Sequence, residues 1–172
     1  LNARSIQYGT YVNSSTTGAS SNRHNPGFII AKRETTQSYG EAYGFNLVYS
    51  GNHYSSIERS NHDLLRINMG INPYCFEWVL NESESFETPE AILTYSNQGL
   101  ATLSNNFHNF INKHIVRGPW KDKERPILLN SWEAFQFRFN KAKLLKLAKI
   151  GKQVGVELFV LDDGWFSRRN DD

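Results

Sequence analysis

The 172-residue chain has a single cysteine, Cys75, and so cannot form an internal disulfide. One unpaired thiol favours a reducing compartment, and we expect a cytoplasmic protein. No apolar run approaches the roughly 18–20 residues that a membrane-spanning helix requires, so no membrane partner is expected. Residues 1–7 also lack the basic and apolar regions of a signal peptide.

Charge of one sign is equally scarce, because 19 Lys and Arg residues stand against 17 Asp and Glu residues, a net charge of +2. A nucleic-acid partner is therefore not expected, since such proteins carry a strong basic excess. The chain is instead rich in aromatic residues, at 13%, within a hydrophobic fraction of 39%. That is enough apolar surface for a folded core, and it excludes wholesale disorder.

The composition changes along the chain near residues 117–120. All eight tyrosines lie at or before Tyr95. Residues 1–116 carry 7 basic and 9 acidic side chains, whereas residues 117–172 carry 12 basic and 8 acidic ones. This change predicts two architectural units.

The first unit has the pattern of an antiparallel β-structure. Short apolar or alternating runs predict strands at residues 28–31, 41–50, 62–71 and 75–80. Clusters of Gly, Asn, Ser and Pro separate these runs, as the turns of an antiparallel sandwich require.

Between the two units the apolar residues recur at steps of three and four, which predicts an amphipathic helix from about Asn97 to Ile115. This helix would carry the chain from the sheet to the second unit. Its stripe consists of Leu100, Leu103, Phe107, Phe110 and His114, with Ile111 beside them. A metal site is not favoured, because His108 and His114 are six residues apart and share no helix face.

The second unit reads as a strand, a helix and a parallel strand. Residues 127–129 and 156–161 are continuous apolar runs, typical of parallel strands that are covered on both faces. Between them, Lys141 to Val154 is a predicted helix with Asn140 as N-cap and Gly155 as its stop. Two strands and one helix cannot cover all of these faces, so we expect a fragment of a longer protein.

A basic stripe on the predicted helix has two possible meanings. It consists of Lys143, Lys146, Lys149 and Lys152. We interpret it as a solvated outer face rather than a phosphate site.

Each strand of the second unit delivers an indole and a carboxylate to the same edge of the sheet. Trp132 and Glu133 follow the first strand, and Asp162, Asp163 and Trp165 follow the second. Ligands of α/β proteins bind beyond the carboxyl ends of strands. Carboxylates accept strong hydrogen bonds from hydroxyl groups, and an indole offers a flat apolar face to a sugar ring. The pattern predicts a carbohydrate site.

Other roles are open for these residues. Asp162 could instead cap a turn, and Trp165 could fill the core. Asp162 and Asp163 could also be the catalytic pair of a glycosidase. A retaining enzyme needs two carboxyls roughly 5–5.5 Å apart on opposite sides of the scissile bond. Adjacent residues leave one stretch of backbone and grip one region of the ring, so binding fits them better than catalysis.

Two segments around these residues, Arg125–Ala134 and Glu157–Phe166, closely resemble bacterial α-galactosidases of glycoside hydrolase family 36. The resemblance extends back over residues 43–52, 70–73, 86–90, 95–99 and 103–104.

This resemblance implies the architecture. Residues 1–96 would be the later part of an N-terminal β-supersandwich, and residues 97–124 a linker helix and connection. Residues 125–172 would be the first two strands and first helix of an incomplete (β/α)₈ TIM barrel.

The resemblance also implies a function, that of an α-galactosidase fragment. The parent would hydrolyse terminal α-galactosyl residues, as in melibiose and raffinose, with retention of configuration and no metal or organic cofactor. The nucleophile and acid/base of the family are aspartates after the fourth and sixth barrel strands. Both lie beyond this chain, so no catalytic residue is assigned and the fragment alone is expected to be inactive.

Site roles carry over from the family to matching positions only. Asp162 and Asp163 would hold hydroxyls of the terminal galactose, Trp132 would line its subsite, and Trp165 is a further candidate for the same wall. Relatives are often tetramers, so a homo-oligomer is expected.

Two alternatives to the hydrolase remain. One is a non-catalytic carbohydrate-binding module, against which residues 1–116 show no comparable Trp/Asp cluster. The other is an α-N-acetylgalactosaminidase or galactosyl transferase of the same family.

Overall fold

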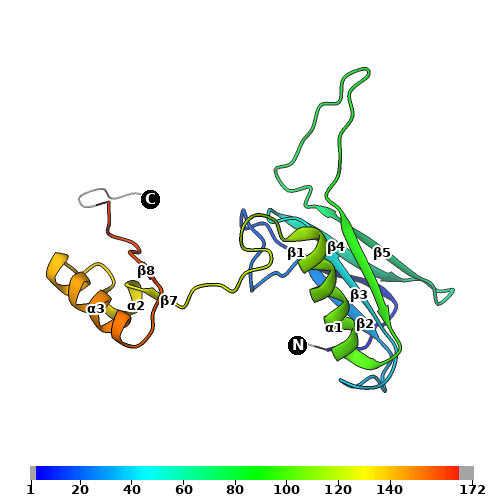
Figure 1. Cartoon of the computed structure of the whole chain (residues 1–172). Helices are drawn as coiled ribbons and strands as arrows, with labels where there is room; N and C mark the ends of the chain where they lie inside the picture. The colour runs from blue at the N-terminus through cyan, green and yellow to red at the C-terminus, as the bar shows by residue number, and fades with distance from the viewer. Residues whose placement is uncertain (1–2, 167–172) are drawn as a thin grey trace. The chain divides into compact units, whose positions relative to one another are not determined.

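The computed structural model describes residues 3–166 and divides into two compact units, Leu1–Lys113 and His114–Asp172 (Figure 1). No helix within residues 3–166 combines the length and the apolarity needed to cross a lipid bilayer.

The first unit contains two three-stranded antiparallel sheets, in the orders β1-β4-β5 and β2-β3-β6. The strands are β1 Gly9–Ser14, β2 Gly27–Ala31, β3 Ala42–Leu47, β4 His53–Arg59, β5 Leu65–Ile71 and β6 Ala91–Ser96. Strands β2, β3 and β5 confirm the predictions at 28–31, 41–50 and 62–71. Strands β1, β4 and β6 were not predicted from the sequence.

Aromatic pairs across strands hold the second of these sheets in register. Phe28 of β2 lies opposite Phe45 of β3, and the two rings stack with centroids 5.0 Å apart. Tyr43 of β3 lies opposite Tyr95 of β6 at 4.9 Å. Such cross-strand pairs stabilise a sheet beyond its backbone hydrogen bonds.

Helix α1, Gly99–Phe110, packs against β3 and β6 through the predicted apolar stripe (Figure 1). Leu103 is fully buried there, and the Phe107 ring lies directly over Gly44. A five-residue π-helical segment, η1 Ile111–Ile115, continues the chain. The helix predicted over residues 97–115 is therefore confirmed, and α1 also covers one sheet face instead of only connecting two units.

The start of α1 has no side-chain cap, and the backbone of another loop takes that place. The N–H groups of Leu100 and Ala101 donate to the carbonyls of Thr36 and Gln37 at 3.0 and 2.9 Å. Gly99 makes this approach possible, because a Cβ there would lie 2.5 Å from the Tyr39 nitrogen. These contacts satisfy N–H groups that a helix end otherwise leaves unpaired.

Residues 75–80 form no strand, so the prediction for that segment is wrong. They belong to the long green excursion between β5 and β6 in Figure 1. Trp78 is 60% exposed and Val79 80%, and the Trp78 ring contacts Phe86 within the same excursion at 4.8 Å. The alternating pattern was present, but among the described residues no neighbouring strand pairs with this backbone.

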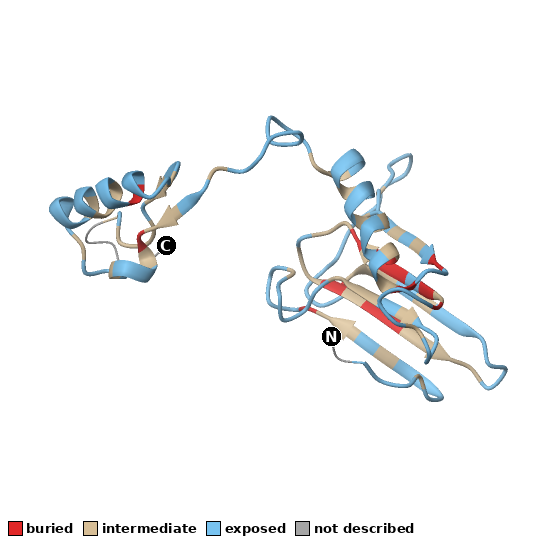
Figure 2. Cartoon of the chain, turned by 60° about the horizontal axis from the view of Figure 1, so that its bottom comes forward, coloured by how far each residue is buried: buried red, intermediate tan, exposed pale blue. Residues whose placement is uncertain are grey.

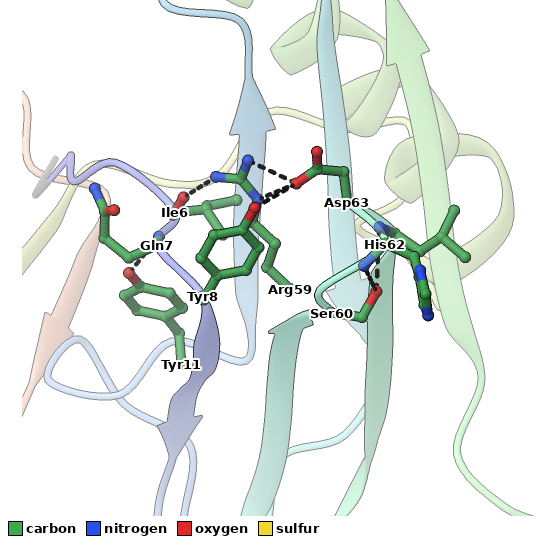
Figure 3. A network of polar contacts seen from close by, with 9 residues as sticks. Ile6, Gln7, Tyr8, Tyr11, Arg59, Ser60, His62 and Asp63 are labelled. Carbon is green, nitrogen blue, oxygen red and sulfur yellow. Dashed lines mark hydrogen bonds and ion pairs between the residues drawn. The ribbon is translucent and has the colours of Figure 1, made fainter.

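A polar network fastens the segment before β1 to the turn between β4 and β5 (Figure 3). The Arg59 guanidinium donates to Asp63 Oδ1 at 2.9 and 3.2 Å and to the Ile6 carbonyl at 2.9 Å. It also lies over the Tyr8 ring, 4.8 Å from the centroid. One side chain thus links residues that are more than fifty positions apart.

The second unit is a parallel pair of strands joined through a helix. Its elements are β7 Leu128–Asn130, α2 Trp132–Phe135, α3 Lys141–Gln153 and β8 Leu158–Val160. Strands β7 and β8 pair in parallel, with Leu128 opposite Leu158 and Asn130 opposite Val160. This confirms the predicted strand–helix–strand unit, while the loop after the first strand contains the additional short helix α2.

The ends of α3 are those the sequence predicted. The Asn140 side chain accepts a hydrogen bond from the Lys143 N–H at 3.0 Å, which makes it the N-cap. Gly155 follows the helix with φ +90°, a left-handed conformation that suits a stop. The four lysines of the stripe are all exposed, as the solvated-face interpretation expects. Figure 2 shows most of this helix as exposed.

Candidate functional site

Polar side chains join the carboxyl ends of β7 and β8. Asn130 is the last residue of β7, and its Nδ2 donates to Asp162 Oδ2 at 2.6 Å. Ser131 adds two links, because its Oγ accepts the Asp162 N–H at 3.1 Å and its own N–H donates to the Val160 carbonyl at 3.0 Å. The predicted site residues after the two strands are therefore held at one edge of the sheet.

The two adjacent aspartates have different surroundings. Asp162 accepts the Asn130 amide on Oδ2 and the Asp163 backbone N–H on Oδ1 at 2.8 Å. Both of its oxygens are therefore engaged by the protein. The half-buried Asp163 carboxylate, in contrast, makes no hydrogen bond or ion pair with any other residue between 3 and 166. Asp163 has both oxygens available for a ligand.

Trp132 is brought to the same edge by its backbone and its ring. Its N–H donates to Asn130 Oδ1 at 2.8 Å, and its ring meets Phe137 edge-on with centroids 5.0 Å apart. Phe137 in turn lies against Gly164, where a Cβ would be 3.3 Å from the Phe137 ring. A continuous row of contacts thus runs from Trp132 to the residue next to Asp163.

Trp165 lies in the turn that follows Asp163, and its indole is 63% exposed. Its ring contacts Phe166 at 5.8 Å in an edge arrangement. Trp165 is therefore not buried within this unit, and its place in the wall of a sugar site stays a prediction.

The capping alternative for Asp162 is correct in part, since this side chain accepts the N–H of the next residue. The sequence analysis missed the residues that position the site: Asn130, Ser131, Phe137 and Gly164. One signal for Asn130 was available, because an Asn that ends a strand commonly accepts the N–H two residues on and starts a turn.

A β-rich unit precedes a parallel α/β unit whose strand ends carry two carboxylates and an indole. This is the combination that the resemblance to glycoside hydrolase family 36 predicts. A family model described as Glycosyl hydrolase family 36 N-terminal domain matches residues 1–81, and one described as Melibiase matches residues 85–172. The chain belongs to glycosyl hydrolase family 36.

Curated relatives show how much of the family's full length is present. The chain is 46% identical over 168 residues to Alpha-galactosidase 1 of Pediococcus pentosaceus. It is 47% identical over 167 residues to Alpha-galactosidase Mel36A of Lactobacillus acidophilus. These matches cover 98% and 97% of this chain but only 23% of each relative. The chain is therefore a fragment in comparison with these proteins.

Solved structures agree with this assignment. The α-galactosidase AgaA of Geobacillus stearothermophilus is similar with a TM-score of 0.90 at 43% identity, over 96% of this chain and 23% of that one. A variant of AgaA in complex with raffinose gives the same TM-score and identity over 98% of this chain and 23% of that one. The chain corresponds to part of the N-terminal region and the start of the catalytic domain of such enzymes.

Proposed function

We propose that the whole protein is an α-galactosidase that hydrolyses terminal, non-reducing α-D-galactosyl residues of melibiose and raffinose-type oligosaccharides. The observation that carries this proposal is the Asp163 carboxylate, which has no partner among residues 3–166 and lies beside the row of contacts that begins at Trp132. The named activity of the relatives, and the raffinose bound to a variant of AgaA, support the same substrate class.

Each of the four predicted residues has a role in this proposal. Asp163 accepts hydrogen bonds from galactosyl hydroxyls with both oxygens, and Asp162 accepts through the lone pairs that its protein contacts leave free. The Trp132 ring covers the apolar face of the sugar, and the exposed Trp165 extends that wall. These groups bind and orient the substrate, and none of them breaks the bond.

The chemistry itself belongs to residues outside this chain. In a retaining mechanism one carboxylate attacks the anomeric carbon while a carboxylic acid protonates the leaving oxygen. Water then hydrolyses the covalent galactosyl intermediate, assisted by the same second group as base. We assign this retaining mechanism to the whole protein and no metal or cofactor to it.

The finer architecture is part of the same proposal. Residues 1–96 form the later part of a β-supersandwich, residues 97–124 the linker helix and connection, and residues 125–172 the start of a (β/α)₈ barrel. The parallel pairing of β7 and β8 and the helix between them support the barrel. A cytoplasmic location and a homo-oligomer complete the proposal, supported by the single cysteine and by the family resemblance.

The test uses the complete protein. The complete protein is expected to release galactose from melibiose and raffinose but not from lactose, the β-linked control. NMR should show the α-anomer of galactose as the first product. Absence of any α-galactoside hydrolysis would refute the proposal. Sugar binding without hydrolysis would favour the carbohydrate-binding module, and a preference for N-acetylgalactosaminides would favour the other family activity.

A further inference from the structure

Asn130 contacts both sides of the proposed sugar site. Its Nδ2 donates to Asp162 Oδ2 at 2.6 Å, and its Oδ1 accepts the Trp132 N–H at 2.8 Å. The residue is partly buried, at the carboxyl end of β7, where the two preceding strand residues are both leucines. Asn130 therefore makes hydrogen bonds at the strand ends instead of apolar packing contacts along the strand.

The orientation of the Asn130 amide follows from its partners. A backbone N–H can only donate, so the Trp132 N–H requires the amide oxygen. The ionised Asp162 carboxylate can only accept, so it requires the amide nitrogen. With the side chain held at both ends, Asn130 has one orientation, and Asp162 receives a hydrogen bond from a rigid donor.

The hydrogen bonds continue from Asp162 to Asp163, whose carboxylate accepts from no other residue between 3 and 166. Asp162 uses its other oxygen to accept the Asp163 N–H at 2.8 Å. A rotation of the Asp162 carboxylate would therefore break both contacts and release the backbone from which the Asp163 side chain departs. Asn130, Asp162 and Asp163 form a chain of hydrogen bonds that ends at the proposed ligand.

We propose that Asn130 is a positioning residue for galactoside binding, which orients the Asp162 carboxylate and the start of α2 together. This inference rests on the proposed function and extends it to a residue without a predicted role. Asn130 acts through Asp162 and Trp132, so its replacement should weaken substrate binding more than the chemical step.

Three substitutions in the complete protein separate this role from a structural one. Asn130→Asp keeps the acceptor for the Trp132 N–H but faces Asp162 with a second carboxylate. Asn130→Ser keeps a hydroxyl near that N–H, yet it is too short to reach Asp162. Asn140→Asp adds the same charge at the N-cap of α3, where Asp caps as well as Asn, and serves as the matched control.

The readout is the ratio of variant to wild-type KM for melibiose as a function of pH. For Asn130→Asp we expect KM to rise about tenfold at neutral pH, the effect of one lost hydrogen bond to a charged group, with kcat nearly unchanged. In acidic buffer a proton bound between the two facing carboxyls of this variant restores the hydrogen bond, and KM should approach the wild-type value. The Asn130→Ser variant should show a raised KM at every pH, and the control should match wild type.

Neighbouring acidic groups do not account for a difference in the KM ratio between variants. Asp163 and Glu133, the neighbouring carboxyls on the two strand ends, are present in the wild type and in all three variants, so each comparison at one pH contains them on both sides. A wild-type KM in Asn130→Ser, or a raised KM in Asn130→Asp that does not recover at low pH, would overturn the inference. If the wild-type protein hydrolyses no α-galactoside, the proposed function itself fails and the inference fails with it.

Discussion

The unequal surroundings of Asp162 and Asp163 lead to different expectations for thermal stability when each is replaced by asparagine. Asp163→Asn in the complete protein removes a charged acceptor that no described residue uses. Each hydrogen bond from a sugar hydroxyl to that carboxylate is worth about 1.5–3 kcal/mol, so kcat/KM should fall about 10- to 150-fold per lost bond. The thermal midpoint should stay at the wild-type value, because the substitution removes no contact among residues 3–166.

Asp162→Asn is the matched comparison. The Asp162 carboxylate accepts from two donors, the Asn130 amide and the Asp163 N–H, whereas an asparagine side chain has only one accepting oxygen. One donor would then face an amide NH₂ group, which costs roughly 1–3 kcal/mol of folding free energy. This variant should therefore melt earlier as well as bind substrate less well.

The assay combines kcat/KM for a chromogenic α-galactoside with thermal melts of the two variants and the wild type. Wild-type activity in Asp163→Asn would refute the assignment of the free carboxylate to the substrate. Equal destabilisation in both variants would show that Asp163 has a structural partner and would refute the distinction between the two aspartates.

Three further outcomes are expected. The isolated 172-residue chain should not hydrolyse a chromogenic α-galactoside, and measurable turnover would show that the catalytic groups lie within it. Leu103→Ala should lower the free energy of unfolding by about 2–5 kcal/mol, because this side chain of α1 is fully buried. Leu145→Ala, at a position 51% exposed, is the control and should change it little in a denaturant titration. The Lys32 ammonium, 2.6 Å from Glu41, lowers the pKa of that carboxyl below its ordinary value of 4.5, mainly through their hydrogen bond. A lowered pKa stabilises the fold above the ordinary value, and this contribution is lost as the pH falls through the lowered one. In Glu41→Gln that part of the acid sensitivity should disappear, and an unchanged acid unfolding curve would contradict it.

The two longer helices were predicted correctly, because each has a local signal in the sequence. The spacing of Leu100, Leu103 and Phe107 indicated α1, and Asn140 and Gly155 marked the ends of α3. These features act within one or two helical turns, so the chain expresses them before any tertiary contact forms.

Strands depend on partners, and there the sequence was less informative. The polar β4 contains the fully buried His53 and Ser55, and it is a strand because β1 and β5 pair with its two edges. Residues 75–80 alternate more clearly and yet form no strand, because no partner lies beside them within the described part of the chain.

The sequence by itself determined that two strands end in acidic and aromatic residues, and its motifs indicated the family. Only the tertiary structure decided that Asp162 is engaged while no residue in the described part of the chain binds the Asp163 carboxylate, and that Asn130 connects the two strand ends. The physical reason is that Asn130 and Asp162 are 32 positions apart along the chain. They meet only because β7 and β8 pair in parallel with Asn130 opposite Val160.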